Sequence, residues 1–127
     1  SSPKLQVMNN ALFSAYSGLT FAEARSDPEH WGRLVESAVG AHLANWAASG
    51  GGQLATWRER NAEVDFVVSQ GRKVVAIEVK SGRAPEFHAG LTQFSSAFHP
   101  DRTILVGGDG IELETFLKSS VDLWLAD

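Results

Sequence analysis

Three strand-like runs follow one another between residues 53 and 80, with only short breaks between them. The runs read QLATWRE (53–59), EVDFVVS (63–69) and KVVAIEVK (73–80). Stretches of this length that are rich in β-branched and aromatic residues predict strands, and the short QGR break at 70–72 predicts a hairpin between the last two. Any fold for this chain must therefore be built around consecutive strands linked by tight turns.

Helices are expected on both sides of these strands. Asp27 is a good N-cap and Pro28 suits the first turn, which predicts a helix from Pro28 to about Ala48 that stops at the SGGG of 49–52. A second helix is expected from Pro85 to about Phe98. The other expected elements are a strand at 5–8, a helix within 11–18, a strand in RTILVGG (102–108), a short helix in IELETFLKS (111–119) and a last strand in VDLWLAD (121–127). This order predicts an α/β domain with a mixed central sheet flanked by helices.

Composition narrows the class of protein. A chain of 127 residues with 43% hydrophobic and 20% charged residues fits one domain with a real core. It has no cysteine, so disulfides, thiolate zinc sites and cysteine nucleophiles are excluded, and a reducing cytoplasm is the expected location. No run approaches the roughly 20 apolar residues that cross a bilayer, so no membrane partner is expected. The opening SSPKLQVMNN resembles neither a leader nor a natural start, which predicts more protein upstream.

The net charge of −4 bears on nucleic-acid binding. Acidic residues outnumber basic ones by 15 to 11, which argues against non-specific coating of nucleic acid because such binding rests on neutralised phosphates. A local basic patch remains compatible with this balance. The candidates for contact with a DNA backbone, together with Lys73, are Arg58, Arg60, Arg72 and Arg83. A solvated charged rim is the alternative interpretation of the same residues.

Charged residues end the apolar run of 73–80. Alternation places Glu78 and Lys80 on one face of that strand. A two-residue loop at Gln70 and Gly71, or a four-residue loop over 69–72, puts Asp65 on the same face, diagonal to Glu78 and roughly 5–8 Å away. A three-residue loop would turn one strand over and separate them. The opposite face of the middle strand is expected to carry Val64, Phe66 and Val68.

The long helix predicts a fourth member of this group. Its apolar stripe consists of Gly32, Val35, Val39, Leu43, Trp46 and Ala47, and Glu36 falls in the middle of it. A carboxylate on a buried stripe is costly unless it is paired or bound to a cation. The small Gly32 and Gly40 leave room for a close approach to the sheet. We therefore expect Glu36 to converge with the three charged residues of the strands.

Carboxylates grouped with one ammonium have a specific chemistry. Hard divalent cations such as Mg²⁺ prefer oxygen ligands and keep several waters. Such a cation polarises a phosphate, lowers the pKa of a bound water and stabilises developing negative charge. Asp65, Glu78 and Glu36 are the expected ligands for Mg²⁺ or Mn²⁺, with the Val79 carbonyl as a further one. Lys80 is expected to position the attacking water.

Asp65, a gap of 12 residues, and Glu78-Val79-Lys80 resemble the PD-(D/E)xK motif of restriction-endonuclease-like nucleases. Glu36 matches the helix-borne acid frequent in that superfamily, and Gln93 resembles an accessory polar residue of some branches. The segments PKLQVMNNAL, WGRLVESAVGAHL, TWRERNAEVDFVV, AIEVKSG and ILVGGDGI together resemble the uncharacterised C-terminal domain of prokaryotic AAA-type ATPases. The chain departs from these patterns in two places. Val64 stands where the motif has proline, and Asn9 or Asn10 stands where the ATPase group often has Asp.

The resemblance implies a restriction-endonuclease-like fold over residues 1–127, as the C-terminal part of a longer ATPase chain. It implies a catalytic set of Glu36, Asp65, Glu78 and Lys80 that hydrolyses DNA with Mg²⁺, as an endo- or exonuclease. The GGDG of 107–110 lacks the Lys-Ser/Thr of a phosphate loop and predicts a turn, so no ATP hydrolysis is expected in this part. The alternative is a catalytically inactive module that binds DNA or a protein partner for the upstream ATPase. A homo-oligomer is compatible with either function.

Bland interpretations of the same charges remain open. Glu78 and Lys80 can form a surface ion pair worth under about 1 kcal/mol. Glu36 can form a buried ion pair with Lys80 or with an arginine of the strands. Glu63 is placed by the hairpin either in the metal site or in solvent at the start of its strand.

Overall fold

The computed structural model describes residues 28–60, 62–80 and 89–127. The expected strand at 5–8, the expected helix within 11–18, the Asp27 cap and Arg83 lie outside these ranges. So does the expected start of the second helix at Pro85.

The described elements follow the order expected from the sequence. The helices are α3 (Pro28–Ala48), α4 (Ala89–Phe98), α5 (Leu113–Lys118) and α6 (Asp122–Leu125). The strands are β1 (Gln53–Glu59), β2 (Ala62–Gln70), β3 (Lys73–Val79) and β4 (Arg102–Val106). The long helix, the three consecutive strands, the strand at 102–106 and the short helix after it confirm the corresponding predictions.

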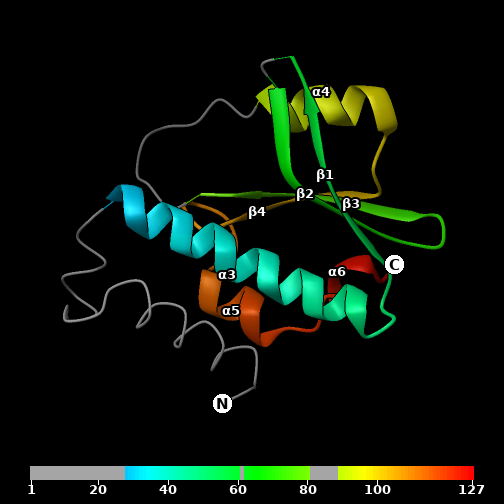
Figure 1. Cartoon of the computed structure of the whole chain (residues 1–127). Coiled ribbons are helices and arrows are strands. Elements are labelled where there is room, and N and C mark those ends of the chain that lie inside the picture. Colours follow the sequence, from blue (N-terminus) through cyan, green and yellow to red (C-terminus); the bar gives the residue numbers. More distant parts are fainter. Residues whose placement is uncertain (1–27, 61, 81–88) are drawn as a thin grey trace.

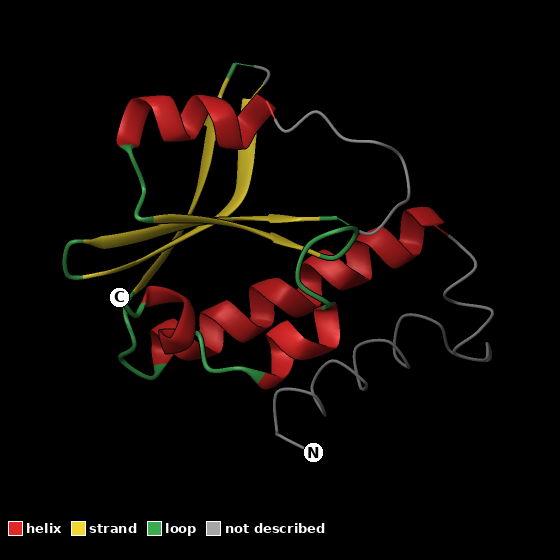
Figure 2. Cartoon of the chain, turned by 180° about the vertical axis from the view of Figure 1, so that it is seen from behind, coloured by secondary structure: helices red, strands yellow, loops and turns green. Residues whose placement is uncertain are grey.

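The four strands form one mixed sheet in the order β1-β2-β3-β4. The first three are antiparallel, and β4 runs parallel to β3. Figure 1 shows α4 over one face of this sheet and α3, α5 and α6 below the other, and Figure 2 shows the same layers from behind. The predicted α/β class, with a mixed sheet between helices, is confirmed.

Each face of the sheet has its own core. The larger core lies between the sheet and α3, α5 and α6, and includes Val39, Leu43, Ile77 and Phe116. The smaller one lies under α4, and its buried members are Val64, Ala76 and Phe94. The predicted apolar stripe of α3 is confirmed by the burial of Val35, Val39, Leu43 and Trp46.

The predicted role of Gly40 in a close approach is also confirmed. A Cβ at this position would lie 3.1 Å from Cζ of Phe66, so the helix rests directly on the Phe66 ring of β2. α3 and the sheet thus approach each other closely at Gly40.

The pairing register of the hairpin between β2 and β3 is shifted by two residues from the expected one. Gln70 pairs with Lys73, so the two-residue loop is Gly71-Arg72 rather than Gln70-Gly71. Gly71 has φ +60°, which suits glycine as the first loop residue of a type II′ turn. A shift of two residues keeps the faces unchanged. It places Asp65 across from Glu78 rather than diagonal to it.

The predicted face of Val64 is wrong, because β2 contains a bulge. Ala55 pairs with Val67 but Trp57 pairs with Val64, so β2 has one extra residue over this stretch. The extra residue reverses which face of the sheet each side chain lies on, from the bulge back to the start of β2. Phe66 therefore packs into the larger core, whereas Val64 packs under α4.

The predicted last strand is also wrong, since Asp122–Leu125 is a short helix. Val121 and Leu125 lie four residues apart and are both buried, which is a helical spacing. Trp46 Nε1 donates a hydrogen bond of 2.8 Å to Asp122 Oδ1, which ties this helix to α3. Such a short apolar run does not reveal its period in the sequence alone.

Two helical glycines provide a matched test of this packing. A Cβ on Gly90 would lie 1.9 Å from the carbonyl oxygen of Glu63, whereas a Cβ on Gly40 meets only the far end of the Phe66 ring. Gly90→Ala is expected to lower the free energy of unfolding by about 2 kcal/mol or more, since the backbone of β2 must move. Gly40→Ala is expected to stay within about 1 kcal/mol of the parent, because the helix propensity of alanine offsets the ring contact. Urea denaturation measures both, and equal stability of the two variants would contradict this packing.

Candidate functional site

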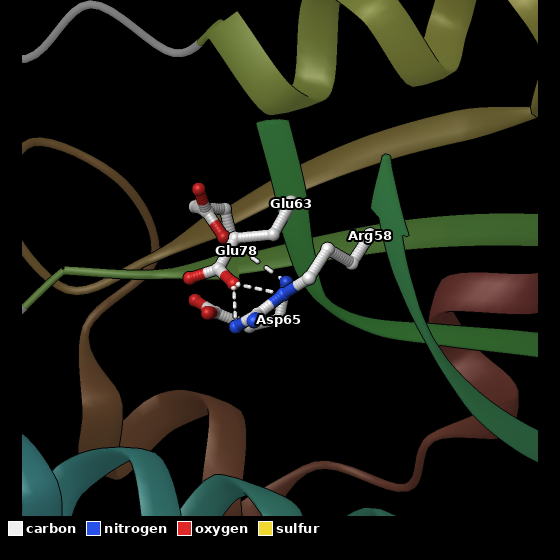
Figure 3. A network of polar contacts seen from close by, with 4 residues as sticks. All are labelled: Arg58, Glu63, Asp65 and Glu78. Carbon is white, nitrogen blue, oxygen red and sulfur yellow. Dashed lines mark hydrogen bonds and ion pairs between the residues drawn. The ribbon is translucent and has the colours of Figure 1, made fainter. Parts of the chain in front are cut away.

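The site lies where the ladder between β2 and β3 ends. The last backbone pair is Phe66 with Ile77. Beyond it, the Asp65 amide donates to Glu78 Oε1 at 3.2 Å, and the Val79 amide donates to Asp65 Oδ2 at 2.8 Å. Each carboxylate thus accepts a hydrogen bond from the opposite strand, and both side chains are half-buried. Figure 3 shows them together at the end of the two strands.

The acid–acid contact changes the ionisation of Glu78. Burial raises the pKa of Glu78 to about 8, helped by a hydrogen bond with the Asp65 carboxyl group and by the negative charge of Asp65. The Asp65 amide and the charge of Lys80 act in the opposite direction but are weaker. The protonated form of Glu78 is therefore favoured at neutral pH.

Glu36 interacts electrostatically with Asp65, and its side chain is exposed. It nevertheless lies at nearly the same angle on the helix as the fully buried Leu43. The angle of a residue on the helix therefore did not determine burial at this position. Partial burial and then the charges of Asp65 and Glu63 raise the pKa of Glu36. Of the predicted convergence of Glu36 with Asp65, Glu78 and Lys80, only an electrostatic interaction with Asp65 is seen, and the predicted burial of Glu36 is wrong.

Lys80 follows β3 directly and is half-buried. Its amide donates to the Val106 carbonyl at 2.7 Å, and its positive charge acts on Glu78. A Cβ on Gly107 would lie 1.9 Å from the Lys80 carbonyl oxygen, and Gly107 has φ +85°. The glycine-rich segment is a turn, as expected, and it packs against the backbone of Lys80.

The sequence left open whether Glu63 lies in the metal site or in solvent. Arg58 Nη2 donates to Glu63 Oε2 at 2.6 Å, and both side chains are exposed. Figure 3 shows the Glu63 carboxylate beside those of Asp65 and Glu78. Glu63 is therefore paired with Arg58, and its charge contributes to the raised pKa of Glu36. The pairing of the two residues across β1 and β2 could have been found only from the correct register.

The other candidate residues are spread out. Gln93 is exposed on α4, and within the described residues it forms no hydrogen bond with the acids of the site. Arg60 lies in the turn between β1 and β2, and Arg72 lies in the turn at the opposite end of β2. The structure therefore keeps Arg58 and Arg60 near the carboxylates and separates Arg72 from them.

The donor set can be compared with the needs of a divalent cation. Across residues 28–60, 62–80 and 89–127, no three His, Asp or Glu side chains are grouped so as to hold a metal ion. Asp65 and Glu78 each use one oxygen to accept a backbone amide, and a hydrogen bond links the two carboxyl groups. Mg²⁺ usually binds one or two carboxylates and keeps several waters. The pair fits a Mg²⁺ site of that kind, without Glu36 as a third direct ligand.

A family model covers this site. It matches residues 31–116, about two thirds of the chain, and is described as a domain of unknown function, DUF4143. The chain belongs to the DUF4143 family. This family is found in proteins associated with AAA-type ATPases. The matched range includes the four residues that the sequence predicted to be catalytic in this chain. Neither a curated protein nor a solved structure matches the chain. None of the described helices has the length and apolar character needed to span a membrane.

The raised pKa of Glu78 predicts an unusual dependence of stability on pH. The folded state keeps a proton that the unfolded state releases above the ordinary pKa of 4.5, so stability falls as pH rises from 4.5 to about 8. Glu78→Gln keeps an oxygen that accepts from the Asp65 amide, and it removes the loss of stability at higher pH. At pH 8.5 it is expected to raise the free energy of unfolding by about 1 kcal/mol, allowing for solvent screening of a half-buried group.

Near pH 4 the two proteins should be equally stable, because Glu78 is then protonated in both states. Urea denaturation at the two pH values measures the difference. A Glu78→Gln protein that is destabilised equally at both pH values would contradict a proton held by Glu78 in the folded state.

Proposed function

We propose that this DUF4143 domain is a Mg²⁺-dependent nuclease that hydrolyses phosphodiester bonds of DNA. The single observation that carries the proposal is the Asp65–Glu78 pair, two half-buried carboxylates held together by backbone amides at the end of two strands. Loss of the Glu78 proton leaves two negative charges side by side, and a divalent cation offsets their repulsion. The proposal includes a restriction-endonuclease-like fold, for which the mixed sheet between helices is the support.

Each residue has a role in this proposal. Asp65 and Glu78 would hold the cation, with the Val79 carbonyl as a further ligand. When bound, the cation supplies Lewis-acid stabilisation of the phosphate and a more acidic water. Lys80, whose charge already acts on Glu78, would hold the attacking water or neutralise the developing negative charge. Glu36, across from Asp65, would accept a hydrogen bond from water in the site.

The wider setting of the proposal rests on the family. Because DUF4143 domains are found with AAA-type ATPases, we propose a nucleotide-binding domain upstream in the same chain and a cytoplasmic protein. Arg58 and Arg60, at the same end of the sheet as the acids, are the proposed contacts for the DNA backbone. Arg58 would then exchange Glu63 for a phosphate.

Cleavage assays test the activity. Single-stranded and duplex DNA are incubated with Mg²⁺ or Mn²⁺, and the products are resolved by electrophoresis. Asp65→Asn, whose amide oxygen still accepts from Val79, and Lys80→Ala are each expected to lose about 100-fold or more of the rate. Glu114→Gln serves as the charge-matched control, because Glu114 lies on α5 in an exposed pair with Lys118. Equal cleavage by all four proteins would contradict the assigned roles.

Metal affinity should depend on pH in a way set by Glu78. Since Glu78 must release its proton before both carboxylates serve as ligands, the affinity for Mn²⁺ is expected to fall about tenfold per pH unit below about 8. Calorimetric titrations at several pH values measure this slope. Glu78→Gln should bind weakly at every pH, and a pH-independent affinity of the parent protein would contradict the coupling.

One observation favours a second function. The carboxylates of Asp65 and Glu78 replace backbone hydrogen bonds that the broken ladder lacks, which by itself explains their presence. On this basis we propose, as the alternative, a catalytically inactive module that binds DNA or a protein for the upstream ATPase. Absence of Mn²⁺ binding at pH 8.5, with the Asp65→Asn protein less stable than the parent, would favour this alternative over the nuclease.

A further inference from the structure

A shallow depression of about 500 Å³ lies on the flank of α4 that faces β4. It is lined by Leu91, Thr92, Ser95, Ser96, His99 and Thr103. Four of these side chains recur at spacings of three and four residues along and just past α4, so they share one side of the helix. No carboxylate is among the lining residues, although acidic residues outnumber basic ones in this chain by 15 to 11. We call this surface the hydroxyl depression.

The hydroxyl groups of the depression form no hydrogen bond with the described residues. Ser49 and Ser119, in contrast, each donate to the carbonyl oxygen four residues earlier, at 2.8 Å and 2.7 Å. In the part of the chain that the structure describes, no hydrogen bond is formed by the four hydroxyls that line the depression. Serine and threonine within helices commonly bond back to the helix, so this group of hydroxyls is available to a ligand.

The depression lies on the same face of the sheet as Glu78. Along the β3–β4 ladder, Glu78 pairs with Leu105 and Ala76 pairs with Thr103. Ile104 packs into the larger core, so Thr103 and Leu105 point to the α4 side, where alternation also places Glu78. Two residues of strand separate the two levels, which is about 7 Å. The depression is thus a short step from the acid pair.

We propose that the hydroxyl depression binds the sugar–phosphate backbone of a DNA strand whose phosphate group lies at the Asp65–Glu78 pair. This inference rests on the proposed function. Hydroxyl and imidazole donors are typical partners of phosphate and sugar oxygens, and they read no sequence. A separation of two residues along the ladder, about 7 Å, is short enough for one strand to contact both places. Because hydroxyl groups carry no charge, they add affinity without adding to its salt dependence.

Binding of a labelled strand tests the inference separately from cleavage. Fluorescence anisotropy measures the affinity of a fluorescein-labelled DNA strand of about 12 nucleotides for the full chain carrying Asp65→Asn. Adding Thr92→Ala and Ser96→Ala is expected to weaken binding about three- to tenfold, with an unchanged slope against salt concentration. Both residues are exposed and alanine favours helix, so the fold is retained. Thr115→Ala is the matched control, since Thr115 is an exposed threonine on α5, across the sheet from α4.

The outcomes separate the two proposals. Weaker binding in the double variant alone supports the depression as a backbone site, even where the parent protein cleaves no DNA. Equal affinity in all variants, or no binding of the strand at all, overturns the inference. A loss of affinity of the same size in the Thr115→Ala control also overturns the inference. Cleavage that survives the double variant with unchanged affinity leaves the proposed function standing and removes the depression from it.

Discussion

The β2–β3 ladder stops at Phe66 and Ile77, and two carboxylates take over the hydrogen bonds of the amides beyond it. Burial, followed by the hydrogen bond and the charge of Asp65, raises the pKa of Glu78 to about 8. Partial burial, followed by the charges of Asp65 and Glu63, raises the pKa of Glu36. The same contact therefore completes the sheet and creates a place where a cation is favourable.

The surrounding fold maintains this contact from three directions. The bulge in β2 switches the face of the strand, so that Phe66 meets α3 while Val64 meets α4. Gly90 brings the first turn of α4 onto the backbone of Glu63, and Gly107 brings the turn after β4 onto the backbone of Lys80. Small residues at both contacts let separate elements approach closely. The acids and the lysine are thus held by backbone packing rather than by long side chains.

Much of this arrangement follows from local patterns in the sequence. The helix with Gly40 at its sheet contact, the three strands and the juxtaposition of Asp65 with Glu78 were all predictable, because proline, glycine and alternation act over a few residues. The bulge was not, since an extra residue in one strand is visible only once its partner strand is known. The burial of Glu36 was overestimated as well. A helical wheel gives the angle of a side chain but does not determine its burial.

A carbon-13 NMR titration of the Glu78 side-chain carboxyl tests the central claim most directly, because it observes the proton itself. The account predicts a midpoint near pH 8 without divalent cations and a marked decrease when Mg²⁺ is added. In Asp65→Asn, the midpoint should fall toward the ordinary value, since the neighbouring charge is gone. A midpoint near 4.5 in the parent protein, unchanged by Mg²⁺, would contradict the account.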